Sequence, residues 1–496
     1  MKKQNSNMLR LLRSFNYKRI INDINGLGYR YTLKNLIVTM AIYAVVTALV
    51  AIALNLDIAF SILMIAATVL FIPGLVHNAY KRKYDKILFS DVSQYIEQML
   101  YSFKNNRKIY KSLQDIMPLF ETSPIYADLE ELSENILAEG NEAAIKYFDA
   151  KYSCNKITTV HGFFLESEKI GGDIDETINL LIDDNAAWKE RTEGFRKDRN
   201  KWRTSIIGAI IISFALCILM EKMLPAEVGI IENVLVRITS VIVYVAEIML
   251  YSIMDRRLSV SMIGNSASRS ERQIIRYYED FMSHDKTKIL KKSLKTSLPI
   301  LIIAIAVTFI LKNTFVSIAA FVLAALVFFR PMISYRSHVR ILKEEIRIQF
   351  PSWLMSMAML AQSNSIQVAL YKSIFCAPVV LKPELTTLCN ALTDDPDSAR
   401  PYHNFMKGFD MPDITASMKM FYAISSGAGA DAKKQISDII KRTNMMVDKA
   451  ERHANDNFIA GLYSLFLAPQ VVGGAKLMVD MVVFLVMFAG SAATLY

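Results

Sequence analysis

The sequence predicts an all-α membrane protein organised as a tandem parallel repeat. Each unit is expected to hold two transmembrane helices, a cytoplasmic helical bundle and two further transmembrane helices. Hydrophobic residues make up 53% of the 496 positions and charged residues 21%, an apolar share too high for a string of soluble domains. Long apolar segments occur along the chain, and similar residues recur at one fixed separation.

The apolar segments define the expected spans. A helix needs about 20 mostly apolar residues to cross the hydrocarbon layer of a bilayer. Four segments meet this condition clearly: 35–56, 58–76, 204–220 and 313–329. Residues 296–311 are uncharged but short, and three further segments contain a charge or a proline: 233–254, 458–475 and 477–496. We expect about eight spans, the last two separated by a turn at residues 473–476.

Basic residues in the flanks predict the orientation. Eight Lys and Arg residues and one acid, Asp23, precede the first span, which places that end in the cytoplasm. Every large segment then lies on the same side, and the opposite side receives short turns such as 221–232. The expected order is a basic N-terminal segment (1–35), spans 1 and 2 (36–76), the first cytoplasmic bundle (77–203), spans 3 and 4 (204–254), a basic linker (255–295), spans 5 and 6 (296–329), the second bundle (330–457) and spans 7 and 8 (458–496).

The repeat has a period of 257 residues. Matching residues at this separation are Ile109/Ile366, Leu113/Leu370, Phe148/Phe405, Ile157/Ile414, Thr158/Thr415, Phe164/Phe421, Gly172/Gly429 and Ile182/Ile439. Because each unit has an even number of expected spans, the two copies point the same way, unlike the inverted repeats of many transporters.

Helical periodicity predicts the bundles. An apolar stripe at spacings of three and four runs through Val92, Tyr95, Ile96, Met99, Leu100 and Phe103, as on the buried face of a helix. A second helix contains Leu129, Leu132, Ile136 and Leu137 and ends near Gly140. A third is expected over 157–169, and Asp173 is the expected N-cap of the helix that continues into the third span.

Several short motifs resemble the type II secretion F domain. They are Asn105-Asn106-Arg107-Lys108-Ile109 with Ser112-Leu113, Glu139-Gly140-Asn141, and Glu168-Lys169-Ile170-Gly171 followed by Ile174 and Ile178. The second copy carries Asn364-Ser365-Ile366 with Ala369-Leu370, and Ser425-Ser426-Gly427-Ala428-Gly429, so that Ser425 stands where the first copy has Glu168. This family contains the inner-membrane platform proteins of type II secretion systems, type IV pili, Tad pili and archaeal flagella.

The resemblance implies a platform protein without catalytic activity of its own. Such a protein couples a hexameric cytoplasmic secretion ATPase to the insertion of pilin or pseudopilin subunits. The doubled arrangement is most similar to paired Tad platform proteins joined in one chain, and it leaves open whether the chain forms a homo-oligomer. The alternatives are a multi-span transporter or channel with regulatory bundles, and a membrane-anchored signalling scaffold.

Catalytic and metal-binding motifs are missing from the sequence. It contains no GxxxxGK[ST], GxSxG or HExxH pattern, and its six histidines and four cysteines lie at no ligand spacing. We therefore expect neither an enzyme nor a cofactor or metal site. The net charge of +10 fits the positive-inside rule and contact with anionic lipid, and no basic module with interleaved aromatic residues indicates nucleic-acid binding.

Two groups of residues remain as candidate sites. Glu247 and Asp480 are acids within expected spans, where they serve either as a proton or ion site or as packed and interface-seeking side chains. The others lie at the helix junctions of the bundles: Glu166, Glu168, Gly171, Gly172, Asp175, Gly427 and Gly429. The acids form either solvated surface or a docking face for the ATPase. Gly171 and Gly172 permit a sharp turn with positive φ, with a hinge as the alternative, and Gly427 and Gly429 are candidate hinge or ATPase-contact residues in the second copy.

Overall fold

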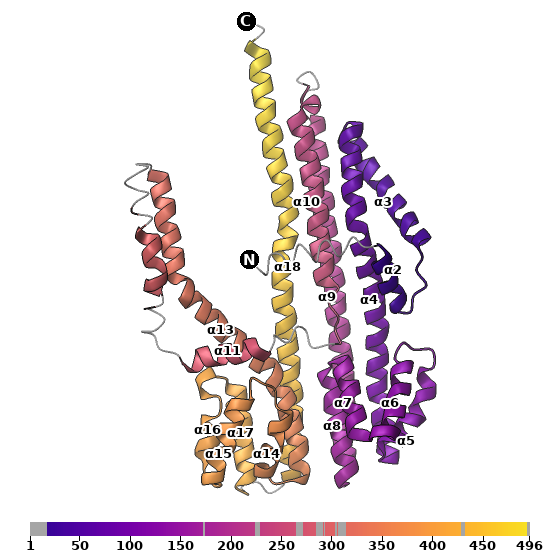
Figure 1. The fold of residues 1–496 in the computed structure, drawn as a ribbon, viewed down its shortest axis with the longest axis vertical. Helices are drawn as coiled ribbons and strands as arrows, with labels where there is room; N and C mark the ends of the chain where they lie inside the picture. The colour runs from indigo at the N-terminus through magenta and orange to yellow at the C-terminus, as the bar shows by residue number, and fades with distance from the viewer. Residues whose placement is uncertain are drawn as a thin grey trace. The chain divides into compact units, whose positions relative to one another are not determined.

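The computed structural model describes residues 17–171, 174–223, 229–263, 271–283, 291, 293–302, 305, 314–427 and 432–493. Helices dominate these residues, and none of them lies in a strand, which confirms the all-α prediction (Figure 1). The chain forms two compact units. Unit 1 takes its residues from Met1–Cys154, Ile182–Ser266 and Arg452–Tyr496, and unit 2 from Asn155–Leu181 and Ala267–Glu451.

Five helices of the described chain are long and apolar enough to cross a membrane, which supports the prediction of a membrane protein. They are α3 (Leu33–Ala53), α4 (Ile58–Asn106), α9 (Asp175–Met223), α10 (Val234–Leu258) and α18 (Ala432–Ala493). The expected span 296–311 lies partly outside the described residues, and the expected span 313–329 falls almost entirely within α13 (Thr314–Ser363). The total of about eight spans counts two at the C-terminus that α18 joins into one helix, and the number of spans in the rest of the chain stays a prediction.

The turn expected at residues 473–476 is wrong. α18 continues through this region without interruption, and Pro469 also lies inside it. Its 62 residues correspond to about 93 Å at the rise of an α-helix. A charged residue at position 476 was interpreted as the tip of a turn, but a charge inside an apolar helix can also be paired with a charge on its neighbour. The two expected C-terminal spans are therefore one continuous helix.

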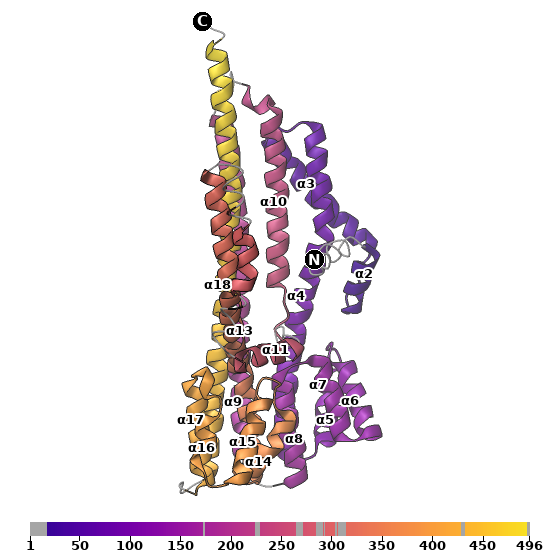
Figure 2. The same cartoon turned by 60° about the vertical axis from the view of Figure 1, so that its left-hand side comes forward.

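The apolar helices of unit 1 pack through α4. α3 and α10 both lie against it, and this arrangement is visible in two views (Figures 1 and 2). The contact includes a small buried polar group: the hydroxyl of Tyr244 lies 2.7 Å from Thr47 Oγ1 and 2.9 Å from Thr68 Oγ1. Near the chain start, α2 (Tyr17–Gly26) also packs on α4, and Tyr31 makes an edge contact with Tyr80. A short 3₁₀ turn, η3 (Ile230–Glu232), precedes α10.

The remainder of unit 1 is a helical bundle. The second half of α4 packs with α5 (Ile109–Ile116), η1 (Met117–Phe120), α6 (Tyr126–Glu139) and α7 (Asn141–Tyr152). Every residue of the predicted α4 stripe is buried, as its helical period requires. The predicted second helix is α6, on which Leu129, Leu132 and Ile136 are buried and Leu137 is 70% exposed. Gly140 separates α6 from α7 with φ of 86°.

Unit 2 is built around α13. Its other helices are α8 (Asn155–Ile170), α11 (Glu271–Met282), α14 (Ile366–Cys376), α15 (Lys382–Asp394), α16 (Ala399–Asn404), the 3₁₀ turn η4 (Lys407–Phe409) and α17 (Pro412–Ser425). Trp353 of α13 is fully buried, and its indole N–H donates to Ser373 Oγ of α14 at 3.1 Å. This bond satisfies a donor that would otherwise be buried without a partner.

α8 belongs to unit 2 although it comes from the first half of the sequence. It packs against α13, and Asn155 Nδ2 donates to Ser352 Oγ at 3.3 Å. α11 lies within the expected basic linker 255–295 and also packs on α13, where Tyr277 stacks on His338. The compact units divide the chain at other positions, and the bundle boundaries 77–203 and 330–457 stay predictions.

Candidate functional site

Three helices of unit 1 bring an ionic cluster together among the apolar spans. Lys476 Nζ of α18 lies 2.6 Å from Glu221 Oε1 of α9 and 2.6 Å from Asp480 Oδ2, one turn further along α18. The side chains of Lys476, Glu221 and Asp480 are 1%, 3% and 0% exposed, respectively. Ser240 of α10 donates to Glu221 Oε1 at 3.5 Å. We call these four residues the Lys476 cluster.

The Lys476 cluster contains more acceptors than donors. Glu221 Oε2 and Asp480 Oδ1 are buried and have no hydrogen-bond partner. With both acids ionised, one lysine faces two carboxylates and the cluster carries one net negative charge. Charges without partners are costly in a low-dielectric interior. The ion pair between Lys476 and Glu221 joins α18 to α9, and the cluster keeps one more carboxylate than it has cations.

A second polar contact joins the same three helices. Glu247 of α10 is 1% exposed, and its Oε1 lies 3.0 Å from Ser213 Oγ of α9. The same hydroxyl lies 3.1 Å from the carbonyl oxygen of Pro469 on α18. Glu247 Oε2 is buried without a hydrogen-bond partner, and no ion pair to Glu247 occurs in the described part of the chain. We call Glu247, Ser213 and Pro469 the Glu247 relay.

Small residues permit the close packing of α9 and α18 beside the relay. A Cβ atom at Gly473 would overlap Ser213 Oγ, and Cys217 Sγ lies 3.9 Å from the Gly473 carbonyl oxygen. Small residues at a helix contact bring the backbones together and favour association in lipid. Gln470 Nε2 donates to the Ala209 carbonyl oxygen at 3.4 Å and continues the same interface.

The sequence identified half of these ionisable residues. Glu247 and Asp480 were predicted as acids within spans, and both are buried there. Glu221 and Lys476 were assigned to short turns, but Glu221 lies inside α9 and Lys476 inside α18. The side of the membrane assigned to them stays a prediction. The spacing of Lys476 and Asp480, four positions apart on one helix, is the available signal, because residues at this spacing share a helix face.

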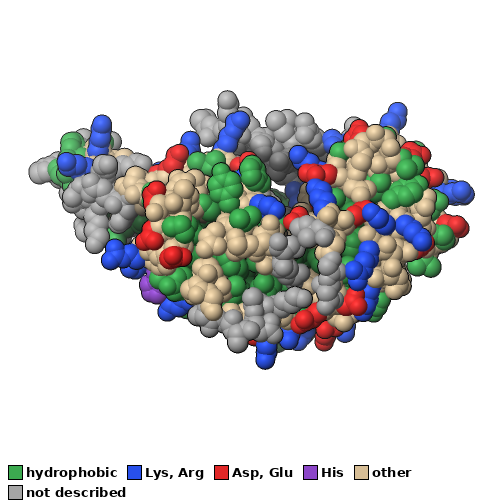
Figure 3. All heavy atoms as spheres, turned by 90° about the horizontal axis from the view of Figure 1, so that it is seen from below, with side chains coloured by type: hydrophobic (Ala, Val, Ile, Leu, Met, Phe, Trp, Pro, Cys, Tyr) green, Lys and Arg blue, Asp and Glu red, His purple; other side chains and the backbone are tan. Residues whose placement is uncertain are grey.

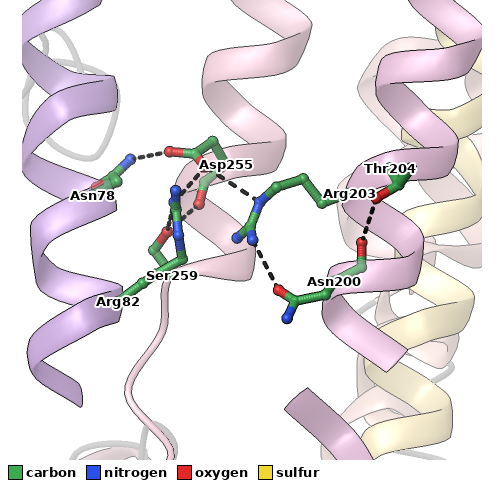
Figure 4. Close-up of polar contacts among 7 residues, drawn as sticks. All are labelled: Asn78, Arg82, Asn200, Arg203, Thr204, Asp255 and Ser259. Atoms are coloured by element: carbon green, nitrogen blue, oxygen red, sulfur yellow. Dashed lines mark hydrogen bonds and ion pairs between the residues drawn. The ribbon is translucent and has the colours of Figure 1, made fainter. Parts of the chain in front are cut away.

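A third polar group lies near the C-terminal end of α10, between α4 and α9 (Figure 4). Asp255, 1% exposed, accepts from Arg82 Nη1 of α4 at 2.5 Å and from Asn78 Nδ2 at 2.9 Å. Arg82 also donates to Ser259 Oγ at 2.9 Å. Arg203 Nε of α9 lies 3.7 Å from Asp255 Oδ1, and Arg203 Nη1 donates to Asn200 at 3.0 Å. We call this set the Asp255 cluster.

The Asp255 cluster joins three helices through one carboxylate. Two guanidinium groups face a single acid, so the cluster has one net positive charge. Arg199 lies nearby on α9, with its guanidinium 4.7 Å from the centre of the Phe458 ring and its Nη1 donating to the Val260 carbonyl oxygen. A positively charged girdle where apolar helices end is typical of the headgroup region of a bilayer.

Those predicted bundle-site residues that the structure describes lie at or near helix junctions of unit 2. Glu166 and Glu168 are half-buried on α8, and Asp175 is exposed at the start of α9. Glu176, next to Asp175, accepts from Ser437 Oγ of α18 at 2.8 Å. Figure 3 shows Asp and Glu side chains interspersed with Lys and Arg side chains and apolar groups on the face that it draws. The choice between solvated surface and docking face stays open.

The prediction of a positive φ is confirmed at Gly171, and Gly427 has a similar conformation. Gly171 follows α8 with φ of 72°, and Gly427 follows α17 with φ of 66°. Both values lie in the left-handed region, where residues with a Cβ are strained. Gly172, Gly429 and the expected N-cap Asp173 lie outside the described residues. The hinge role of the glycines stays a prediction.

The chemistry available at these sites is electrostatic. Within the described ranges, no group of three or more His, Cys, Asp and Glu side chains could hold a metal ion. The buried groups instead offer ion pairing and proton binding among packed helices. Comparison of the chain with models of known protein families, with curated proteins and with solved structures gives no match.

Proposed function

We propose that this protein is an inner-membrane platform protein of a type IV pilus-like, Tad or type II secretion assembly machine. In this proposal it couples a cytoplasmic secretion ATPase to the insertion of pilin or pseudopilin subunits. The motif resemblance supplies the family, and the structure supplies one observation that supports the mechanism. α9 and α18 each extend, as one unbroken helix, from a bundle into the apolar region.

A continuous helix can act as a mechanical link. In α9, Trp188 packs edge-on against Phe89 in the bundle of unit 1, and Ser213 and Glu221 lie among the apolar helices. Its 49 residues correspond to about 73 Å. Because an α-helix is stiff along its axis, a displacement at the bundle end would move the apolar end. An ATPase acting on the bundles would thereby shift the spans that contact a pilin helix.

The tandem parallel repeat is part of the proposal, and the pairing of α9 with α18 supports it. In unit 1 the contacts Ser213–Pro469, Cys217–Gly473 and Glu221–Lys476 join residues 255 or 256 positions apart. This separation nearly equals the repeat period of 257. If the two halves are copies of one unit, α9 and α18 are equivalent helices, and these contacts pair them in parallel and nearly in register.

The bundle helices support the repeat in the same way. α5 begins at Ile109 and α14 at Ile366, two residues matched in the sequence. Leu113 and Leu370 are both 0% exposed, and Phe164 and Phe421 are equally buried on α8 and α17. In these cases, residues separated by the repeat period occupy corresponding positions on α5 and α14 and have the same burial on α8 and α17.

The proposal assigns the bundles to the cytoplasm and the Asp255 cluster to the cytoplasmic headgroup region. Its excess positive charge would contact anionic lipid. The partners would be a hexameric secretion ATPase and pilin or prepilin subunits, and the protein would perform no catalysis of its own. Because two copies are already present in one chain, the mechanism requires no further copy.

The test is co-purification of the full-length protein in mild detergent with a candidate secretion ATPase, followed by measurement of nucleotide turnover. We expect binding and altered turnover, both weakened by Glu168→Lys. The matched control is Glu134→Lys on α6, an exposed position in unit 1, which should bind as the wild type does. Absence of binding in the ATP-bound, ADP-bound and nucleotide-free states would overturn the proposal.

A transporter or channel is the second candidate, and the Lys476 cluster favours it. Ionisable residues within spans often mark ion pathways. Ion flux measured in proteoliposomes containing only this protein would support the second candidate, particularly if Lys476→Met abolished the flux. No flux together with ATPase binding would leave the platform proposal in place.

A further inference from the structure

We propose that Glu247 is a buried proton-binding site, which carries a proton at neutral pH and donates it to Ser213 Oγ. The carboxylic acid, the serine hydroxyl and the Pro469 carbonyl oxygen would then form one directed chain from α10 through α9 to α18. This inference does not depend on the proposed function, because it concerns only the contacts among these helices.

The first reason for assigning a proton to Glu247 is the number of hydrogens available at Ser213. Ser213 Oγ has two polar neighbours at hydrogen-bonding distance, Glu247 Oε1 at 3.0 Å and the Pro469 carbonyl oxygen at 3.1 Å. A hydroxyl group has one hydrogen to donate, and a carbonyl oxygen has none. If Ser213 donates to Pro469, the hydrogen between Ser213 and Glu247 comes from Glu247. A protonated carboxyl group supplies it, and an ionised one does not.

The second reason is the environment of the Glu247 side chain. Its side chain is 1% exposed, and its second oxygen is buried without a partner. An ionised carboxylate in such a place normally has a cation or several donors. In the described part of the chain Glu247 has only the Ser213 contact, so the neutral acid is the form that this environment accommodates.

The neighbouring charges favour the same form. On the adjoining turns of the same interface, α9 carries Cys217 and Glu221, and α18 carries Lys476 and Asp480. Lys476 is already held by Glu221 and Asp480 at 2.6 Å each. From α3 and α4, the described polar groups on this stretch of α10 are the hydroxyls of Thr47 and Thr68, both bonded to Tyr244. The local charge, excluding Glu247, is therefore zero or negative, and it does not stabilise another anion.

Infrared spectroscopy of the full-length protein in lipid nanodiscs tests the site directly. A protonated carboxylic acid has a C=O stretching band that is separate from the carboxylate bands and shifts in D₂O. We expect this band at neutral pH, its loss in Glu247→Gln and its persistence in Asp480→Asn. Ser213→Ala should keep the band and move it to higher frequency, because the acid loses its hydrogen-bond acceptor.

Two results would overturn the proposal. One is a wild-type spectrum at neutral pH without any carboxylic acid band, which would mean that Glu247 is ionised and that Ser213 shares its hydrogen between two acceptors. The other is a band that Glu247→Gln leaves unchanged. A thermal unfolding curve gives an independent readout: Glu247→Gln should keep the wild-type midpoint, since a neutral amide can also donate to Ser213. A large destabilisation of this variant would count against a neutral acid.

Discussion

Gly473 of α18 and Ser213 of α9 lie so close together that a single methyl group at position 473 would overlap the serine hydroxyl. The same hydroxyl contacts Glu247 and the carbonyl oxygen of Pro469. Close packing and the polar contacts therefore depend on the same point of the interface. A helix pair without a side chain at this position can place its backbones near enough for such contacts.

Gly473→Ala should separate α9 from α18 and destabilise the protein. Overpacking of a close contact costs about 1–3 kcal/mol, and here it also strains the bond from Ser213 to Pro469. Gly474→Ala is the matched control, since a Cβ at Gly474 meets nothing within 4 Å. Thermal unfolding in mild detergent should show a lower midpoint for the first variant only. Equal midpoints would show that the interface adjusts to the methyl group.

Lys476→Met should destabilise the protein more than removal of the whole ionic group. The single change leaves Glu221 and Asp480 buried without their cation, a loss of about 3–5 kcal/mol for a broken buried pair. The triple variant Glu221→Gln/Lys476→Met/Asp480→Asn removes all three charges and should recover much of that loss. Lys449→Met, at a position whose side chain is 78% exposed, is the control. A triple variant as unstable as the single one would contradict the pairing argument.

Local patterns in the sequence predicted much of the bundle and little of the ionic cluster. The stripe from Val92 to Phe103 was identified correctly because the helical period alone determines which residues share a face. Glu221 and Lys476 are 255 positions apart in the sequence. Their pairing depends on the register between α9 and α18, and a local period contains no information about that register. Hydropathy counts each charge separately, so it assigned both residues to turns instead of to one neutralised contact.

Asp255→Ala should loosen the junction of α4, α9 and α10. It leaves Arg82 without the carboxylate to which it is bonded at 2.5 Å, and Arg203 without its nearby acid. Removal of one partner from such a group costs about 3–5 kcal/mol when the site is well buried. Asp255→Asn keeps an acceptor for Asn78, so its junction should be less stable than that of the wild type and more stable than that of Asp255→Ala. Proteolysis in nanodiscs, with cleavage near Ser259 as the readout, distinguishes a loosened junction from general unfolding.

Cys389 should resist alkylation in the folded protein. Burial in α15 raises the pKa of its thiol to about 11, so only about a thousandth of it is the reactive thiolate at pH 8. The thiolate fraction should grow about tenfold for each pH unit up to that value, and unfolding should make the site react at the rate of an exposed cysteine. Peptide mapping after iodoacetamide treatment measures Cys389 separately from the other cysteines. Rapid labelling of the folded protein at pH 8 would show that the thiol is accessible and ionised.

The two units can be compared through one pair of residues, Leu113 in unit 1 and Leu370 in unit 2. Both are 0% exposed and lie on α5 and α14, which begin with matched isoleucines. Replacement of a buried leucine by alanine costs about 2–5 kcal/mol, depending on how far the cavity collapses. Leu137→Ala, at the exposed end of α6, should change stability little.

Hydrogen exchange followed by mass spectrometry localises these losses. If the units unfold separately, Leu113→Ala should raise exchange in α5, α6 and α7, and Leu370→Ala should raise it in α14, α15 and α17. A common increase across both units after either change would show that they unfold as one cooperative body. In a platform protein, separate responses would let an ATPase act on one bundle while the other stays folded.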